Sequence, residues 1–348
     1  MSTPLVFPRP NAPLSTGQAP IRAPSEEDFI STFGALLPPA RYVELAEGRA
    51  AYYVFPGAGR ETAETRETAG TGGTANTLPT HALLVHGVQT PALGLLPLVR
   101  ELRSLFPSTT FALLDLWGHG LSDGVVRAQE GALFEGLVGG VLGALGWDSD
   151  SSEAGGKRVA LVGYSFGAVV SMGFVSSTSP ASRCVASLAL VAPAGLLRKS
   201  WFSEQELGYL SPDCSPADEE AAADWTIRTL EGGELTVPAD WREKVAAGEI
   251  VAQALKQWQL DHHAGHAATV TGIFRDGGVF ENEELFQRAK GTGVPLFAVL
   301  GELDGLTDEQ EVRGLGVETR VVEGVGHGVV REREGEVARL IGGFWRGL

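Results

Sequence analysis

The sequence predicts an α/β fold in which helices cover both faces of a mostly parallel sheet. Two observations lead to this fold class. Short apolar runs alternate along the chain with longer segments whose apolar residues recur at helical spacing. The run VALV at 159–162 is apolar at every position, which is typical of a strand covered on both faces. The chain has 348 residues, 43% of them hydrophobic, which suffices for one α/β domain with an insertion or for two domains.

Eight runs are expected to form strands, and the first two read as a hairpin that turns near Gly48. These runs are 41–47, 50–55, 81–85, 110–114, 159–162, 187–191, 294–300 and 318–322. Helical spacing between them predicts helices within 91–106, over 130–146, after Ser165, after Thr307 and over 330–347. Pro97 is expected to mark the true start of the first of these helices.

Changes in composition divide the chain into four parts. Strand runs vanish after residue 195, and helix-like segments at 203–210, 217–231 and 239–274 take their place, which predicts an inserted helical cap. The predicted parts are a flexible or surface-draped N-terminal arm at 1–27, a core at 28–195 and 290–348, an exposed loop insertion within the core at 57–80, and the cap at 196–289.

The motif G-x-S-x-G follows the run at 159–162 and precedes a helical segment. It consists of Gly163, Tyr164, Ser165, Phe166 and Gly167. A turn this tight between strand and helix holds the serine in a strained conformation and points its hydroxyl off the end of the sheet. The alternative is a Gly/Ser turn that merely connects the two elements. Partners at other strand ends favour the catalytic interpretation, with Ser165 as the nucleophile.

Two further polar residues follow later strand runs. Asp304 comes after the run at 294–300, and His327 stands between two glycines after the run at 318–322. Serine, aspartate and histidine then occur in one of the chain orders known for hydrolases that use a nucleophilic serine. The imidazole of His327 is expected to take the serine proton, and Asp304 is expected to orient that imidazole. Glu302 and Asp308 are the alternative acids.

His86 and Gly87 follow the third run and predict the second half of the site. Negative charge that develops on a carbonyl oxygen needs preset N–H donors. We expect these donors to be the N–H groups of Val88 and Phe166, and His86 to serve as a structural hydrogen-bonding residue. The predicted substrate contacts are Gln89, Tyr164 and Trp201. For the tryptophans of the cap, packing against the main domain is the alternative.

These motifs together resemble the α/β-hydrolase superfamily, in its cap-bearing branch of serine esterases, lactonases and C–C hydrolases. The matching pieces are HGV at 86–88, DLWGHGLSD at 115–123, GYSFG at 163–167, GELD at 301–304 and GVGHG at 324–328. The resemblance implies an eight-stranded sheet, a helical lid and no cofactor. Relatives with an aspartate nucleophile, such as haloalkane dehalogenases, are disfavoured because Ser165 holds that position.

The expected function is a serine hydrolase that cleaves an ester, thioester or lactone of a small to medium hydrophobic substrate through an acyl-enzyme. Three alternatives stay open at this stage. The same residues could cleave a C–C bond in a diketone-like compound or transfer an acyl group. A protein of this fold could also bind a ligand without hydrolysing it.

Composition and charge limit the partners. The net charge of −16 disfavours nucleic acid and anionic membranes. No run of 18 apolar residues occurs, and two cysteines give no disulfide framework, so we expect a cytoplasmic protein. Among His262, His263 and His266 there is an i,i+4 pair that could ligate a metal on a helix, but no third ligand of good spacing is evident, and no metal is predicted. A small-molecule substrate is the expected partner, and a homodimer stays open.

Overall fold

An eight-stranded sheet forms the centre of the computed structural model, which describes residues 5–10, 18–58, 78–148, 159–211, 214–215 and 218–348. The strand order is β1-β2-β4-β3-β5-β6-β7-β8. β2 pairs antiparallel with β1 and β4, and the other neighbours are parallel, which confirms the predicted sheet. The strands are β1 Arg41–Glu44, β2 Arg49–Phe55, β3 His81–Val85, β4 Thr110–Leu114, β5 Val159–Tyr164, β6 Val185–Val191, β7 Leu296–Gly301 and β8 Glu318–Val322.

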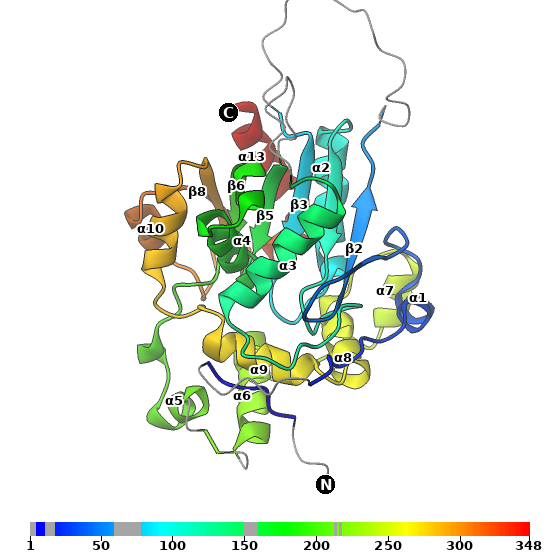
Figure 1. Cartoon of the computed structure of the whole chain (residues 1–348), viewed down its shortest axis with the longest axis vertical. Helices are drawn as coiled ribbons and strands as arrows, with labels where there is room; N and C mark the ends of the chain where they lie inside the picture. Colours follow the sequence, from blue (N-terminus) through cyan, green and yellow to red (C-terminus); the bar gives the residue numbers. More distant parts are fainter. Residues whose placement is uncertain (1–4, 11–17, 59–77, 149–158, 212–213, 216–217) are drawn as a thin grey trace, which may run out of the picture.

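Helices cover both faces of this sheet (Figure 1). Because the central strands β3, β4 and β5 are buried at nearly every residue, both faces of the sheet carry a covering layer. One layer contains α3 (Gly131–Ala144), α4 (Phe166–Ser176) and α10 (Glu283–Gly291), and the other contains α2 (Leu96–Leu105) and α13 (Glu334–Arg346). Shorter elements of the core are α1 Glu26–Phe33, η1 Ala92–Leu95, η2 Pro180–Cys184, α11 Glu309–Gly314 and α12 Val329–Glu332.

Between β6 and β7 the chain leaves the sheet and forms helices beyond the carboxyl ends of the strands (Figure 1). It leaves and returns at neighbouring points, since Leu197 and Phe280 form a β-bridge and Asn282 N–H donates to Gly195 C=O at 2.8 Å. We call residues 198–279 the cap segment. Its helices are η3 Lys199–Trp201, α5 Glu204–Leu210, α6 Glu219–Glu231, α7 Trp241–Ala246, α8 Ala252–His262 and α9 His266–Asp276.

The position of α10 differs from the predicted cap boundary of 196–289. This helix packs on α4, and Leu285, Phe286 and Ala289 are buried in the same core cluster as the sheet. An apolar stripe at helical spacing shows that a helix has one buried face, but it does not show which layer that face meets. The excursion from the sheet therefore ends near residue 279, before α10 begins.

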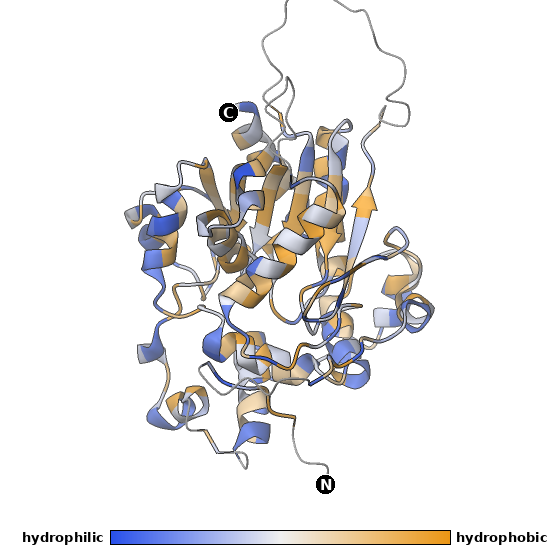
Figure 2. Cartoon of the chain, in the orientation of Figure 1, coloured by the Kyte–Doolittle hydropathy of each residue, from blue (hydrophilic) through white to orange (hydrophobic). Residues whose placement is uncertain are grey.

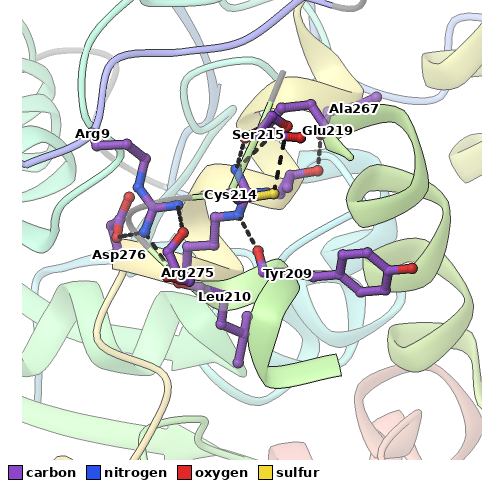
Figure 3. A network of polar contacts seen from close by, with 11 residues as sticks. Arg9, Tyr209, Leu210, Cys214, Ser215, Glu219, Ala267, Arg275 and Asp276 are labelled. Atoms are coloured by element: carbon purple, nitrogen blue, oxygen red, sulfur yellow. Dashed lines mark hydrogen bonds and ion pairs between the residues drawn. The ribbon is translucent and has the colours of Figure 1, made fainter. Parts of the chain in front are cut away.

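The first described residues cross the helices of the cap segment (Figure 3). Phe7 is buried, and the Arg9 guanidinium donates to the carbonyls of Leu210 and Ser211 and pairs with Asp276 at 3.1 Å. These contacts tie the end of α5 to the end of α9. Residues 1–4 and 11–17 of the predicted arm lie outside the described residues.

The later part of the predicted arm lies against the core. Ile21 forms an antiparallel bridge with Gly124, and Arg22 pairs with the buried carboxylate of Asp123 at 2.9 Å. Ser25 accepts a hydrogen bond from Asp28 N–H and thereby caps α1, so regular structure begins at Glu26, inside the predicted range of 1–27.

Hydropathy follows this layered arrangement (Figure 2). Apolar residues gather on the strands and on the helix faces turned toward them, whereas polar residues mark the outer faces. None of the helices in the described ranges has both the length and the apolar composition to cross a bilayer. Of the predicted insertion at 57–80, residues 59–77 lie outside the described residues.

Candidate active site

Ser165 occupies the turn between β5 and α4 in a conformation that few non-glycine residues adopt, with φ 54° and ψ −120°. Its N–H donates to Val191 C=O at 3.0 Å, which holds the turn against the end of β6. Side chains are excluded on both sides: a Cβ at Gly163 would lie 2.5 Å from Gly167 O, and one at Gly167 would lie 2.1 Å from Val85 O. The two glycines of the motif therefore permit the close approach that this turn requires.

The structure brings Ser165, His327 and Asp304 into one hydrogen-bonded chain. His327 Nε2 lies 2.9 Å from Ser165 Oγ, and His327 Nδ1 lies 2.9 Å from Asp304 Oδ2. The other carboxylate oxygen of Asp304 accepts from Leu306 N–H at 2.9 Å. Both oxygens of Asp304 therefore have protein partners, and its side chain has no exposed surface. With Nδ1–H donated to the carboxylate, Nε2 is left to accept the serine proton.

Tyr164 supports the loop that carries His327. Its hydroxyl donates to His327 C=O at 3.0 Å, and its ring centroid lies 5.4 Å from the imidazole centroid. Arg331 donates to the Tyr164 hydroxyl at 3.4 Å. Burial raises the pKa of this phenol above its ordinary value, so the hydroxyl keeps the proton that it donates. Tyr164, predicted as a substrate contact, thus also positions the histidine.

The two alternative acids have other partners. Glu302 accepts from Gly324 N–H at 2.8 Å, and Asp308 caps α11 by accepting from Glu311 N–H at 2.9 Å. Asp304 is the acid that contacts His327.

A cavity of about 470 Å³ opens at Ser165. Val88, Gln89 and Tyr164 lie in its wall as predicted contacts would, together with apolar and charged residues of the cap segment and of α12. The wall consists of Val88, Gln89, Thr90, Tyr164, Ser165, Leu230, Glu231, Ile250, Ala252, Gln253, Lys256, Leu306, His327, Gly328, Arg331 and Glu332.

Trp201 lies elsewhere, although we predicted it as a substrate contact. It belongs to η3, its surface is 53% exposed, and it is not among the described residues of the cavity wall. The sequence did not single out Lys256 or Arg331, which do line the cavity. Lys256 forms an ion pair with Glu231, and burial lowers the pKa of its amine. A single lysine in a helical segment carries no sequence signal for a pocket.

The predicted oxyanion donors flank the serine. Phe166 is the first residue of α4, so its N–H has no partner within the helix. Val88 lies in the cavity wall, one residue after Gly87, where an added Cβ would lie 2.8 Å from Ser165 Cβ. The backbone of the His-Gly pair thus passes close to the serine, which is where a carbonyl oxygen under attack would need donors.

Three buried histidines, one of them in this loop, lie next to one another. His86 accepts from Leu116 N–H at Nε2, and burial lowers its pKa to about 4. The rings of His86 and His119 are 5.2 Å apart, and those of His119 and His266 are 4.8 Å apart. Burial lowers the pKa of His266 to about 3 and that of His119 well below its ordinary value. These rings are neutral hydrogen-bonding groups near neutral pH.

The histidines considered as metal ligands are held by three different carbonyls. His262 Nδ1 contacts Trp258 O at 2.9 Å, His263 Nε2 contacts Ser122 O at 2.8 Å, and His266 Nδ1 contacts Gly118 O at 2.8 Å. His263 and His266 thus connect the end of α8 and the start of α9 to the loop at 115–123, whereas the contact of His262 stays within α8.

This fold, with a serine at the strand-to-helix turn and a histidine at the end of the last strand, is that of an α/β-hydrolase. The chain belongs to the alpha/beta hydrolase family, whose model matches residues 82–340. It is therefore a hydrolase by family. A sequence comparison with curated proteins gives no match.

Solved structures with this fold include three with different activities. The chain is similar to an enol-lactonase from Burkholderia xenovorans LB400, with 15% identity, a TM-score of 0.57, and 88% of this chain and 100% of that chain covered. A carboxylesterase from Nitrososphaera gargenis shares 14% identity at a TM-score of 0.57, with 88% of this chain and 98% of that chain covered. A haloalkane dehalogenase from Bradyrhizobium elkani shares 14% identity at a TM-score of 0.61, covering 88% and 97%. Likeness at this level of identity concerns the fold.

Proposed function

We propose that this protein is a serine hydrolase that cleaves an ester, thioester or lactone of a small to medium substrate through an acyl-enzyme. The observation that carries the proposal is the position of His327, 2.9 Å from Ser165 Oγ on one side and 2.9 Å from Asp304 Oδ2 on the other. The lactonase and carboxylesterase with the same fold act on bonds of this class.

The chemistry follows from the arrangement. His327 Nε2 takes the proton of Ser165 Oγ as that oxygen bonds to the carbonyl carbon, and the N–H groups of Phe166 and Val88 hold the resulting oxyanion. His327 then gives the proton to the leaving oxygen or sulfur, and the acyl group stays on Ser165. A water molecule, deprotonated by His327, releases the acyl group as a carboxylic acid. Asp304 stabilises the imidazolium in both halves.

The cap segment supplies one wall of the cavity and is proposed to be the lid that selects substrates. Leu230, Ile250 and Lys256 come from this segment and line the same cavity as Ser165. Because the wall mixes apolar side chains with a buried ion pair, a substrate with an apolar body and a polar group suits it better than a long alkyl chain.

The test is turnover of p-nitrophenyl esters and of lactones with varied acyl length by the wild-type protein and by Ser165→Ala. We expect turnover to fall by about 10³-fold or more in the variant, since the nucleophile is lost. A fluorophosphonate probe should label Ser165 and leave the variant unlabelled. Turnover of the variant close to wild type would contradict the proposal. Cleavage of a diketone in preference to every ester would instead point to a C–C hydrolase.

A further inference from the structure

The loop between Gly87 and Thr90 contains a strained turn. Thr90 N–H donates to Val88 C=O at 2.9 Å, and the residue between them, Gln89, has a φ of 68°. A hydrogen bond across three residues with this central φ corresponds to the classic γ-turn, which is rare because a side chain crowds the backbone there. Such a turn persists when surrounding groups hold it in place. The question is which groups hold this one.

Two buried side chains hold the peptide groups of Gln89. Its N–H donates to His119 Nε2 at 3.1 Å, and its carbonyl accepts from the side-chain amide of Gln259. Both side chains are fully buried, and His119 follows β4 whereas Gln259 belongs to α8. The turn is therefore clamped from the core on one side and from the cap segment on the other.

The orientation of the Gln259 amide is determined by its second partner. Gly120 N–H donates to Oε1 at 2.9 Å, so the amide nitrogen must face the Gln89 carbonyl. One amide thus satisfies a donor in the loop at 115–123 and an acceptor in the loop at 87–90. Gln259 thus adds a second connection between two loops that the hydrogen bond from Gln89 N–H to His119 Nε2 already joins.

His119 is suited to accept from Gln89 because its other nitrogen is already engaged. Nδ1 contacts Trp117 O at 2.9 Å, where it donates, which leaves the lone pair of Nε2 for the Gln89 N–H. The ring is neutral in this buried position, beside the rings of His86 and His266.

We propose that Gln259 and His119 are positioning residues of the oxyanion hole. By holding the turn at Gln89 they fix the adjacent Val88 N–H toward the oxygen of the tetrahedral intermediate. Since Gln259 comes from the cap segment, this segment has to be seated on the loop for the oxyanion to be stabilised. The proposal rests on the proposed hydrolase function and adds a coupling between the lid and the chemistry.

The experiment compares Gln259→Met and Gln259→Glu with the wild type. Methionine has a similar shape but keeps neither hydrogen bond, whereas glutamate can still accept from Gly120 and faces the Gln89 carbonyl with an acceptor. Gln257→Met on the same helix is the control, because Gln257 bonds only to Asp261 among the described residues and lies at the surface. Each protein is assayed with p-nitrophenyl butyrate and with a trifluoromethyl ketone, which forms an oxyanion at the serine.

In both Gln259 variants we expect kcat to fall by about 10- to 100-fold, less than the loss of a whole donor, with KM within about twofold. The inhibition constant of the ketone should rise by the same factor as kcat falls. The Gln257 control should match the wild type. If Gln259→Met does not fold, Gln259→Glu gives the same comparison with one hydrogen bond retained.

Unchanged kcat and ketone affinity in a folded Gln259 variant would overturn the proposal, and so would a loss confined to KM and melting temperature. Neither result touches the proposed function, which stands if Ser165→Ala is inactive. Wild-type protein whose turnover does not depend on Ser165 would overturn both.

Discussion

Asp304 shows how a single residue can be fixed for one task. Its oxygens accept from two different donors, the His327 ring and the Leu306 N–H, and no part of the side chain is exposed. A carboxylate has acceptor sites for both donors, whereas an amide has one oxygen to offer. The geometry therefore depends on the charge and on the symmetry of this group rather than on its size.

We expect Asp304→Asn to lower kcat by about 10²- to 10⁴-fold while the protein stays folded, because the amide favours the wrong histidine tautomer. Steady-state kinetics on a p-nitrophenyl ester and the circular dichroism spectrum check this expectation. Asp308→Asn is the matched control, since Asp308 caps α11 at the surface. A variant of Asp304 with wild-type kcat would show that another acid orients His327.

At the scale of elements, α10 packs against α4, the helix that begins directly after Ser165. Phe286 is fully buried between α10 and α4, and an added Cβ at Gly195, next to the end of β6, would lie 3.1 Å from its ring. The ring therefore fills the space between α4 and the point where the chain leaves the sheet. Helix α4 in turn carries the N–H proposed to bind the oxyanion.

We expect Phe286→Ala to lower the free energy of unfolding by about 3–5 kcal/mol, because it removes a large buried ring and leaves a cavity. Urea denaturation followed by tryptophan fluorescence measures the change. Gln287→Ala, on the exposed side of the same helix, should change it by less than about 0.5 kcal/mol. A loss below 1 kcal/mol for Phe286→Ala would mean that α10 is not part of the core.

Sequence patterns predicted most of the secondary-structure elements but fewer of the contacts between them. The central strands could be predicted from their apolar runs, and the candidate residues Ser165, Asp304 and His327 from their positions after such runs. The side of the sheet on which α10 packs could not be predicted, because helical spacing gives a buried face without its partner. The sequence did not predict that Arg331 lines the cavity or that Gln259 binds the loop at 87–90, and Trp201 was wrongly expected in the cavity wall. The reason is related, because contacts between distant segments leave no local sequence pattern.

At the scale of the whole molecule, the buried histidines link the core to the cap segment. Burial lowers the pKa of His86 to about 4 and that of His266 to about 3, and it lowers the pKa of His119 well below its ordinary value. In the unfolded chain each of these rings takes up a proton near pH 6.5. Acidification therefore favours the unfolded chain.

We expect the free energy of unfolding to fall as the pH is lowered from about 7 to about 5, since the unfolded chain binds protons that the buried rings do not. Burial raises the pKa of Asp115 to about 6, so this carboxyl binds a proton more readily in the folded chain and opposes the trend. The three histidines outnumber this single carboxyl, and the net effect keeps their sign. His266→Gln should reduce the slope by up to about 1.4 kcal/mol per pH unit, a limit approached near pH 5, where the unfolded histidine binds close to one full proton. His262→Gln, at an exposed site, is the control, and equal slopes in both variants would contradict the assignment.

The chain leaves the sheet at Leu197 and returns beside it at Phe280. This arrangement affects how new substrate specificities could be engineered into the protein. If the cap segment were exchanged as a whole at these two adjoining points, the sheet would keep its strand order and its register. Such a graft would bring new walls for new substrates. The new segment would also need a donor in place of the Gln259 amide, because otherwise the Gln89 carbonyl would lose its hydrogen-bond partner.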